Sequence, residues 1–428
     1  MKKPISFPID NFKEFRNKML NWAQPFNIFC LLDNRQYEFQ VPAFECMLAV
    51  GCKRNIEIDA GDAFESLKQF TSRRQGEWLF GHLGYDLKNE TEQLTSMNAD
   101  GIGFADCHFF VPEIVLQLNE TNLIIHCEEN GEAILKDIES QSTKIEEGLS
   151  SPLKIKDSIS KEDYLSIVKK LQQHILRGDC YEVNFCQEFY AGNAVINPLA
   201  VYCSLLNLSP NPFAALYKLN GRYCICASPE RYFKKEGNKI YSQPIKGTAK
   251  RNLADREADE LSRQYLGNSE KEKSENVMIV DLVRNDLSRI CKQGTVRVDE
   301  LFGIYTFPQV HQMISTISGD LEENTDWIDV VKATFPMGSM TGAPKKRVME
   351  IIERYEHTRR GLFSGSIGYV TPGGDAYFNV VIRSILYNAK TKFISFQAGS
   401  AITFYSNPIE EYEECLLKAA MIKQVLEH

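Results

Sequence analysis

Two pairs of glutamates are spaced so that each pair would lie on one face of a helix. Glu411 and Glu414 are three residues apart, and so are Glu272 and Glu275, which separates the carboxylates of each pair by about one helical turn. Adjacent carboxylates repel unless a cation lies between them, and Mg²⁺ binds carboxylate oxygens while keeping several waters. The spacing fits a metal site. It also fits a solvated acidic face or, for Glu272 and Glu275, a helix start where negative charge is favoured.

Lys246 is a candidate for anion binding or for nucleophilic catalysis. It lies between Ile245 and Gly247, shortly after Pro244. The proline restricts the backbone, and the glycine would let a ligand approach it closely. A lysine can bind an anion, or act as a nucleophile if desolvation or nearby positive charge lowers its pKa. The local sequence by itself also fits an exposed loop lysine.

Glu230 is a candidate general acid. It follows Ser228-Pro229, directly after a predicted strand over 223–227. A glutamate in such a tight turn can donate a proton near neutral pH if its pKa is raised. An ion pair with Arg231 is the alternative that the local sequence favours.

A glycine-containing segment near the C-terminus is a candidate carboxylate-binding turn. Gly399 and Ser400 follow the predicted strand 393–396, and backbone N–H groups in a turn of this kind can bind a carboxylate. Arg383 could add a bidentate contact to the same anion, although a surface ion pair is the alternative. His311 fits a structural histidine better than a catalytic one.

Capping signals predict the helices that would carry these side chains. Ser160 starts a helix that ends at Gly178, and Ser269 with a glutamate three residues later forms a capping box. Asn407 followed by Pro408 starts the terminal helix. The four glutamates therefore lie in the first two turns of two predicted helices.

Strand patterns complete the prediction of the fold. Residues 181–189 alternate between two faces, and 111–126 read as a hairpin. Strands and helices alternate irregularly, which favours an α+β fold with antiparallel sheets. A polar stretch over 129–158 marks the predicted boundary between an N-terminal region (1–150) and a catalytic region (160–420).

Bulk properties exclude several classes of protein. The chain has 428 residues and a net charge of -8, which argues against nucleic-acid binding. Its 12 cysteines are scattered without paired zinc-type spacing and are expected to be reduced, mostly buried thiols. No signal peptide and no membrane span is visible. The sequence thus predicts a cytoplasmic protein without a membrane or nucleic-acid partner.

Taken together, eight segments in order resemble one family, the chorismate-utilising enzymes, which include anthranilate, aminodeoxychorismate, isochorismate and salicylate synthases. The match runs from about Ser160 to Lys418. The segments are Ser228–Arg231, Pro244–Thr248, Glu275–Asp286, Gly338–Lys345, Gly365–Tyr369, Ile382–Ser384, Gln397–Ile402 and Glu411–Glu414. The resemblance implies an α+β fold like that of anthranilate synthase component I, with large antiparallel β-sheets packed face to face and helices on the outside.

The resemblance also implies roles for individual residues. Glu275 and Glu414 would hold Mg²⁺, with Glu272 and Glu411 nearby, and the metal would bind the ring carboxylate of chorismate. Glu230 would protonate the departing C4 hydroxyl. The enolpyruvyl carboxylate and the rest of the pocket would be contacted by Tyr369, Arg383, Gly399, Ser400, Thr341, Gly247, Thr248 and His311.

Lys246 indicates the subfamily. Anthranilate synthases usually have alanine at this position, whereas aminodeoxychorismate synthase component I has lysine, as here. The implied mechanism is attack of Lys246 on C2 as the C4 hydroxyl leaves, followed by addition of ammonia at C4 and expulsion of the lysine. No glutaminase segment is visible, so a separate glutamine amidotransferase subunit would supply ammonia. The alternatives are anthranilate synthase component I and a chorismate-binding subunit without turnover.

Three residues depart from the family's pattern. Glu182 lies where aminating relatives usually have glutamine and hydroxylating ones have lysine, which counts against an isochorismate synthase. It also adds a negative charge near an anionic ligand. Ala401 and Tyr405 replace the glycine and aspartate that are common in the glycine-rich segment.

Overall fold

Antiparallel strands form two large sheets in the computed structural model, which describes residues 3–35, 37, 46–73, 76–128, 130–146 and 148–428. The first is a 12-stranded sheet. Its strands, in spatial order, are β1 (Ile5–Pro8), β8 (Asn122–His126), β7 (Ile114–Leu118), β3 (Cys46–Val50), β2 (Ile28–Asp33), β11 (Phe213–Leu219), β12 (Arg222–Ser228), β21 (Ser384–Asn388), β22 (Phe393–Ile402), β10 (Glu182–Ala191) and β18 (Gly342–Ala343), with β9 (Lys156–Asp157) paired to β10.

The second sheet has 10 strands. Its order is β15 (Ile245–Lys250), β17 (Val310–Asp320), β14 (Lys239–Gln243), β13 (Arg231–Glu236), β20 (Ala376–Asn379), β19 (Ser366–Val370), β5 (Leu79–Leu83), β6 (Cys107–Val111) and β4 (Arg54–Ile58), with β16 (Arg297–Thr306) paired to β17. Strands from both the N-terminal and the C-terminal half of the chain take part in each sheet.

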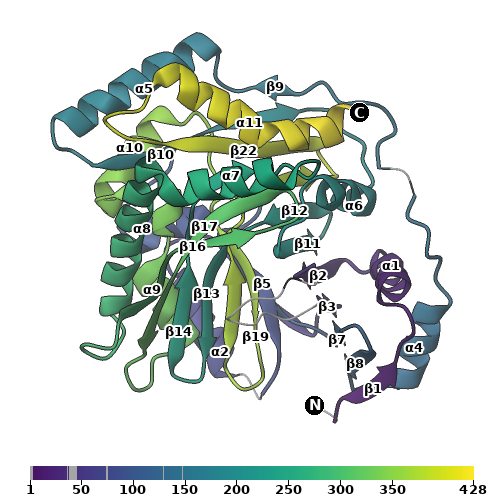
Figure 1. Cartoon of the computed structure of the whole chain (residues 1–428). Helices are drawn as coiled ribbons and strands as arrows, with labels where there is room; N and C mark the ends of the chain where they lie inside the picture. The colour runs from purple at the N-terminus through teal and green to yellow at the C-terminus, as the bar shows by residue number, and fades with distance from the viewer. Residues whose placement is uncertain (1–2, 36, 38–45, 74–75, 129, 147) are drawn as a thin grey trace.

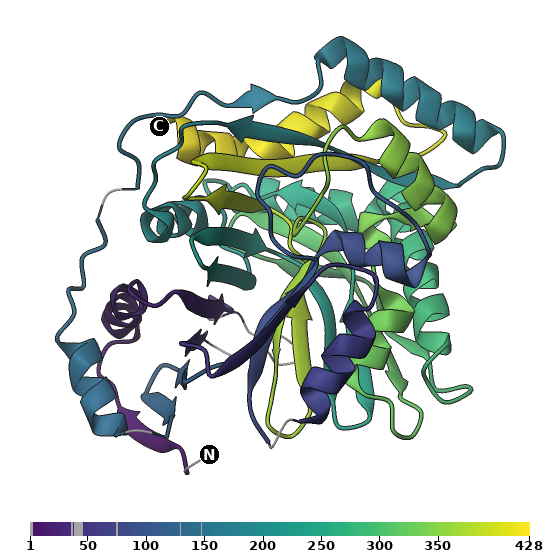
Figure 2. The ribbon, with the colours of Figure 1, turned by 180° about the vertical axis from the view of Figure 1, so that it is seen from behind.

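Helices cover the outer faces of the two sheets (Figure 1). The helix α5 lies beside α11 over β10 and β22, and α8 flanks the second sheet; from behind, α2 lies against α9 (Figure 2). The helices are α1 (Phe12–Ala23), α2 (Ala63–Ser72), α3 (Lys88–Thr91), α4 (Gly131–Glu139), α5 (Lys161–Leu176), α6 (Pro198–Leu208), α7 (Arg256–Asn268), α8 (Glu270–Ser288), α9 (Trp327–Thr334), α10 (Lys345–Tyr355) and α11 (Pro408–Glu427), with 3-10 turns η1 (Tyr85–Leu87) and η2 (Gly338–Met340). The predicted α+β fold is confirmed.

The predicted caps start the predicted helices. The side chain of Ser160 accepts a hydrogen bond from the backbone N–H of Asp163 at the start of α5, and Ser269 accepts one from Glu272 at the start of α8. Asn407 caps α11, with Pro408 in its first turn. These bonds satisfy N–H groups that have no partner within the helix, so short polar motifs define where α8 and α11 begin.

Strand β10 separates two cores, as the alternation of its residues predicts. Val183 and Phe185 are buried with α5 and α11, whereas Cys186 belongs to the core between the two sheets. Glu182 and Asn184 lie on alternate positions to the apolar pair. The strand can therefore present polar groups to a site on one side while it buries apolar groups on the other.

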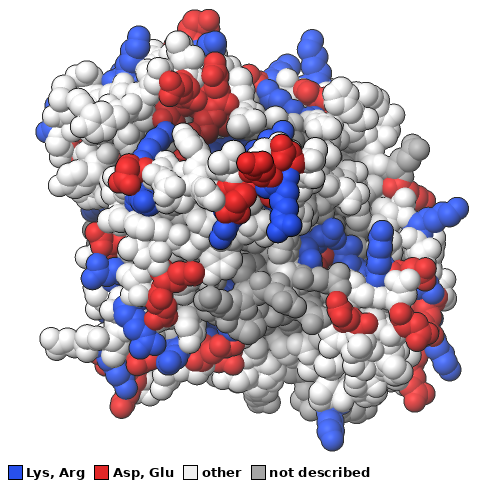
Figure 3. Space-filling model, viewed as in Figure 1, with Lys and Arg blue, Asp and Glu red and all other residues white. Residues whose placement is uncertain are grey.

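The state of the cysteines matches the reduced, mostly buried thiols expected from the composition. All 12 cysteines are free, and all except Cys52 and Cys203 are buried. None of the helices in the described residues is both long and apolar enough to cross a membrane. On the face seen in Figure 3, acidic and basic side chains are interspersed, and acidic ones gather over the upper part, where α5 and α11 lie.

Two histidines are buried between the sheets in a hydrogen-bonded network. The Tyr217 hydroxyl lies 3.2 Å from Nδ1 of His82 and 2.5 Å from Nδ1 of His108. His82 Nε2 also contacts the carbonyl oxygen of Ala105 at 2.8 Å. Burial disfavours the imidazolium, and it lowers the pKa of His82 to about 4 and that of His108 to about 3.

Acid should destabilise the fold through these two histidines. Their pKa values are lower in the folded than in the unfolded chain, so the unfolded chain binds more protons as the pH falls below about 6.5. We expect each to cost about 2 kcal/mol of unfolding free energy at pH 5 relative to pH 7. Urea unfolding at both pH values should show a smaller difference in His82→Gln and His108→Gln. The exposed His357→Gln should behave as wild type, and an unchanged difference in the first two variants would contradict the assignment.

Candidate active site

Lys246 is held inside the protein at the terminal strand of the second sheet. Strand β15 pairs with β17, and the register shifts between Ile245 and Thr248. Gly247 has a φ of 94°, and a Cβ there would lie 3.0 Å from Oε2 of Glu272. The Lys246 side chain is 13% exposed. The alternative of an exposed loop lysine is therefore wrong.

Two carboxylates bind the ammonium group of Lys246. Its Nζ donates to Oε1 of Glu182 at 2.9 Å and lies 3.6 Å from Oε2 of Glu275. Burial disfavours the charged form of Lys246, but Glu182, Glu275 and Glu414 outweigh it and raise the pKa of Lys246 above its ordinary value. In this state the lysine is an ammonium ion, so it must lose a proton before it can attack.

The four glutamates of α8 and α11 share one electrostatic environment. Lys271 is the common neighbour, because its pKa, although lowered by burial, is raised on balance by Glu275, Glu411, Glu414 and Glu272. Burial raises the pKa values of Glu272 and Glu275. The two helices thus bring carboxylates that are far apart in sequence to one place.

Lys418 compensates the charge of Glu414. Its Nζ lies 2.6 Å from Oε1 of Glu414 and 3.0 Å from the carbonyl oxygen of Gly399. Burial alone would raise the pKa of Glu414, but Lys418 outweighs burial and lowers it. The carboxylate of Glu414 is therefore ionised at neutral pH, with Lys418 as its counter-ion.

The donor set fits a magnesium ion. In the described part of the chain, no three carboxylate, imidazole or thiolate groups converge into a closed metal cage. Mg²⁺ does not need one, because it is usually held by one or two carboxylates, with waters and substrate oxygens completing its shell. Glu275 and Glu414 are suitable ligands, and Glu272 and Glu411 lie in the same field. In this structure, Lys246, Lys271 and Lys418 supply positive charge beside these carboxylates.

Glu230 is buried at the corner between β12 and β13. Its backbone N–H donates to Oγ of Ser228 at 3.1 Å, and its Oε1 accepts from Oγ of Ser339 at 2.7 Å. Burial raises the pKa of Glu230 to about 7, although Ser339 and Lys246 act in the opposite direction. Arg231 donates instead to Gln243 at 2.8 Å. A carboxyl that titrates near neutral pH suits a general acid.

Gly399 lies within a strand, where a turn is expected from the sequence. Strand β22 continues to Ile402, and a Cβ on Gly399 would lie 1.9 Å from the carbonyl oxygen of Phe185 on β10. The glycine thus permits close approach of two strands. Ser400 pairs with Phe185 and is buried.

Arg383 directly precedes β21, the strand that pairs with β22 on the side away from β10. Its φ of 52° is in the left-handed region, and its Nη1 donates to the carbonyl oxygen of Lys418 at 3.5 Å. Burial lowers the pKa of Arg383, while Glu414 acts in the opposite direction. A half-buried guanidinium next to the α11 carboxylates is suited to binding an anionic substrate.

Thr341 is hydrogen-bonded to β10 two residues from Glu182. It is fully buried, and its hydroxyl donates to the carbonyl oxygen of Met337 at 3.2 Å. The backbone N–H of Asn184 donates to the Thr341 carbonyl oxygen at 2.8 Å. Thr248 pairs with Gln312 on β17.

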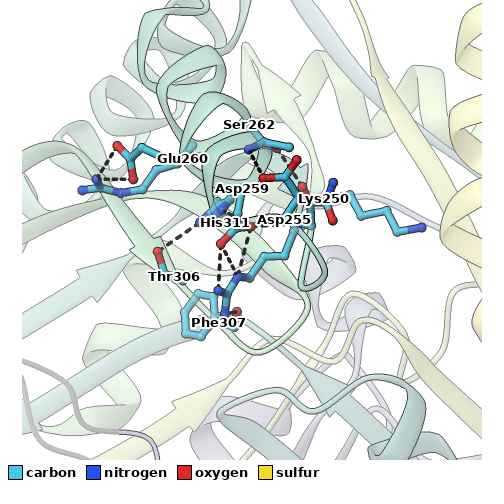
Figure 4. Close-up of polar contacts among 12 residues, drawn as sticks. Lys250, Asp255, Asp259, Glu260, Ser262, Thr306, Phe307 and His311 are labelled. Atoms are coloured by element: carbon cyan, nitrogen blue, oxygen red, sulfur yellow. Dashed lines mark hydrogen bonds and ion pairs between the residues drawn. The ribbon is translucent and has the colours of Figure 1, made fainter.

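Tyr369 and His311 lie in other networks. Tyr369 stacks on Tyr377 with ring centroids 4.9 Å apart. His311 contacts Asp259 Oδ1 at 3.1 Å and Thr306 Oγ1 at 3.0 Å, as Figure 4 shows. No contact found in the described residues joins either side chain to Lys246, so their roles at the substrate remain predictions.

Three side chains of the site escaped the sequence analysis. Ser339 lies inside the segment Gly338–Lys345, but nothing in its spacing marks it as the partner of Glu230. Lys271 and Lys418 are adjacent to or four residues from the paired glutamates. Their positions one helical turn from a carboxylate were the available signal.

Comparisons with known proteins agree on one family. The profile described as chorismate binding enzyme matches residues 27–424. Aminodeoxychorismate synthase component 1 of Bacillus subtilis is 32% identical over 362 residues, which cover 81% of this chain and 76% of that protein. An anthranilate synthase component I-like protein of Synechocystis sp. is 34% identical over 357 residues, with 82% and 73% covered.

Solved structures share the fold. Anthranilate synthase component I from Streptococcus pneumoniae superposes with a TM-score of 0.79 at 26% identity, covering 92% of this chain and 95% of that chain. The menaquinone-specific isochorismate synthase of Escherichia coli has a TM-score of 0.76 at 16% identity, covering 99% and 94%. The second likeness concerns the fold alone.

Proposed function

The chain belongs to the chorismate-binding enzyme family, and we propose that it is component I of an aminodeoxychorismate synthase, which aminates chorismate at C4 in p-aminobenzoate and folate synthesis. The observation that carries this proposal is the placement of Lys246. Lys246 lies between Glu182 and Glu275 and is influenced by Glu414 of α11, which supports its attack on a substrate bound beside these carboxylates.

Two carboxyl groups, those of Glu182 and Glu230, would transfer protons in the first step of the reaction. Glu182 Oε1 lies 2.9 Å from Lys246 and is within reach to accept the proton that the lysine must lose. Neutral Lys246 then bonds to C2 of chorismate, the two ring double bonds shift, and the C4–O bond breaks. The C4 hydroxyl leaves as water with the proton of Glu230, whose pKa of about 7 allows it to be protonated at neutral pH.

A second displacement completes the reaction. Ammonia bonds to C4, the double bonds shift back, and the C2–N bond breaks, so that Lys246 takes its electron pair back. The proton held by Glu182 returns to the lysine, and the new C4 ammonium can return a proton to Glu230. Splitting the substitution in this way replaces one difficult step with two easier ones.

Mg²⁺ would be held by Glu275 and Glu414, with Glu272 and Glu411 close by. When bound, it would neutralise and orient the ring carboxylate of the dianionic substrate. Arg383 is the candidate for the second carboxylate. Ammonia would come from a separate glutamine amidotransferase subunit, and the protein would act in the cytoplasm.

Anthranilate synthase component I is the second candidate. Its support is that proteins bearing this name are also similar, such as that of Aquifex aeolicus, which is 32% identical over 372 residues, covering 82% of this chain and 74% of that protein. Lys246 favours the first candidate, because amination at C2 leaves no role for a nucleophilic lysine at that carbon.

The identity of the product distinguishes the candidates. The protein is incubated with chorismate, Mg²⁺ and ammonium, and the product is identified by liquid chromatography and mass spectrometry. We expect 4-amino-4-deoxychorismate, which retains the enolpyruvyl group. Anthranilate with pyruvate would replace the first candidate by the second, and recovery of unchanged chorismate would indicate a binding subunit without turnover. Glutamine should replace ammonium only after an amidotransferase subunit is added.

A further inference from the structure

In the part of the chain that the structure describes, one side chain hydrogen-bonds to the carboxyl group of Glu230, and it contacts one of the two carboxyl oxygens. Ser339 Oγ lies 2.7 Å from Oε1. Within the described residues, no other side chain hydrogen-bonds to this carboxyl. Both residues line one cavity, together with Tyr232, Thr334 and Asp286. The oxygen Oε2 is therefore the one left for a transferable proton.

Ser339 is itself fixed by the strand that carries the partner of Lys246. The side-chain amide of Asn184 donates to the Ser339 carbonyl oxygen at 2.8 Å. Two residues earlier on β10, Glu182 binds Lys246. Residues two apart on a strand lie on the same face. On this face of β10, Glu182 binds Lys246 and Asn184 binds Ser339, which in turn binds Glu230.

A buried guanidinium locks this arrangement in place. Arg360 donates to the carbonyl oxygen of Met340 at 2.6 Å and to that of Asn184 at 2.8 Å. It also forms an ion pair with Glu356 at 2.6 Å. The loop that carries Ser339 is thus fastened to β10 at the carbonyl oxygen of the serine and, through Arg360, at that of the next residue, which limits the movement of the Ser339 hydroxyl.

A protonated carboxyl has one hydroxyl oxygen and one carbonyl oxygen, and a hydroxyl donor binds the carbonyl oxygen. Donation from Ser339 to Oε1 therefore places the proton of Glu230 on Oε2. We propose that Ser339 is a positioning residue that orients the acid Glu230 for proton transfer from Oε2 to the departing hydroxyl. This inference rests on the proposed function, since it assumes that Glu230 is the acid.

The charged and titratable groups around Glu230 determine the pKa that the pH dependence of the reaction rate would report. Lys246 of β15 lowers the pKa of Glu230, and Asp286 of α8 lines the same cavity but is paired with Lys345 of α10 at 2.6 Å. Arg231 and Tyr232, the first two residues of β13, follow Glu230 directly along the chain. The hydrogen bond from Ser339 also lowers the pKa of Glu230, so its removal should raise it.

The test is the pH dependence of Lys246 adduct formation in single turnovers. The full chain is mixed with chorismate and Mg²⁺ without ammonia, quenched, and analysed by intact mass between about pH 5.5 and 8.5. Leaving ammonia out removes its own titration from the profile. In wild type, the rate should fall as the pH rises through about 7, where Glu230 loses its proton. In Ser339→Ala, the plateau should fall about tenfold, and the descending limb should move up by about one pH unit.

Two further variants show whether the hydroxyl itself is responsible. Ser339→Thr keeps a hydroxyl and should restore the position of the limb. Ser366→Ala removes another buried serine hydroxyl, bonded to the Asn379 carbonyl oxygen, and should leave rate and limb unchanged. The proposal would be overturned if Ser339→Ala reacts more slowly but the descending limb of its pH–rate profile does not move. That result would indicate a general loss of structure, which lowers the rate equally at every pH. Wild type that forms no adduct would instead refute the covalent step of the proposed function.

Discussion

Replacing Lys246 should abolish both the covalent adduct and the formation of 4-amino-4-deoxychorismate. Lys246→Ala removes the amine that contacts Glu182 and Glu275 and that would attack C2, so we expect a loss on the order of 10³-fold or more in kcat. Intact-mass analysis after exposure to chorismate and Mg²⁺ without ammonia should show the adduct in wild type and none in the variant. Product formation is measured in parallel with ammonium present.

A second substitution separates chemistry from charge. Lys246→Ala leaves two carboxylates without their cation, which costs stability as well as activity. Lys246→Arg keeps a positive charge near both carboxylates, but a guanidinium stays protonated and cannot attack. Its adduct should be absent as well. Lys250→Ala changes an exposed lysine on the same strand and should behave as wild type. An adduct that persists in Lys246→Arg would assign the attack to another residue.

Depletion of Mg²⁺ is expected to have the second largest effect on activity. A chelator should stop turnover, and Mg²⁺ should restore it, because the carboxylates of α8 and α11 repel an anionic substrate unless a cation lies between them. Glu275→Gln removes one charged ligand and should weaken Mg²⁺ binding about 10- to 100-fold or more. The measurements are calorimetric titration with Mg²⁺ and the Mg²⁺ concentration that gives half-maximal activity.

Exposed Glu413 offers a matched control for the metal. It precedes Glu414 on α11 but points to solvent, so Glu413→Gln should leave Mg²⁺ affinity unchanged. Glu414→Gln should resemble Glu275→Gln, although it also frees Lys418 from its partner. Full activity in the presence of a chelator, or equal Mg²⁺ affinity in all three variants, would contradict a metal at these glutamates.

Local features of the fold are predictable from short stretches of sequence. Caps at Ser160, Ser269 and Asn407 begin the helices where they are expected, because a side chain satisfies N–H groups only two or three residues away. The alternation of residues along β10 predicts which core each apolar side chain joins: Val183 and Phe185 lie in one core and Cys186 in the other. These features depend on neighbours along the chain, so a sequence reading captures them.

The sequence by itself determined the family, the α+β class and the identity of the candidate acid, nucleophile and metal ligands, since the order of eight motifs is a property of the chain. Only the tertiary structure decided which of these groups meet. The contact of Lys246 with Glu182 spans 64 residues, and that of Glu230 with Ser339 spans 109. Such contacts depend on sheet pairing and helix packing, which no local spacing encodes. For the same reason, Gly399 is found in a strand and the locally exposed-looking Lys246 is buried among carboxylates.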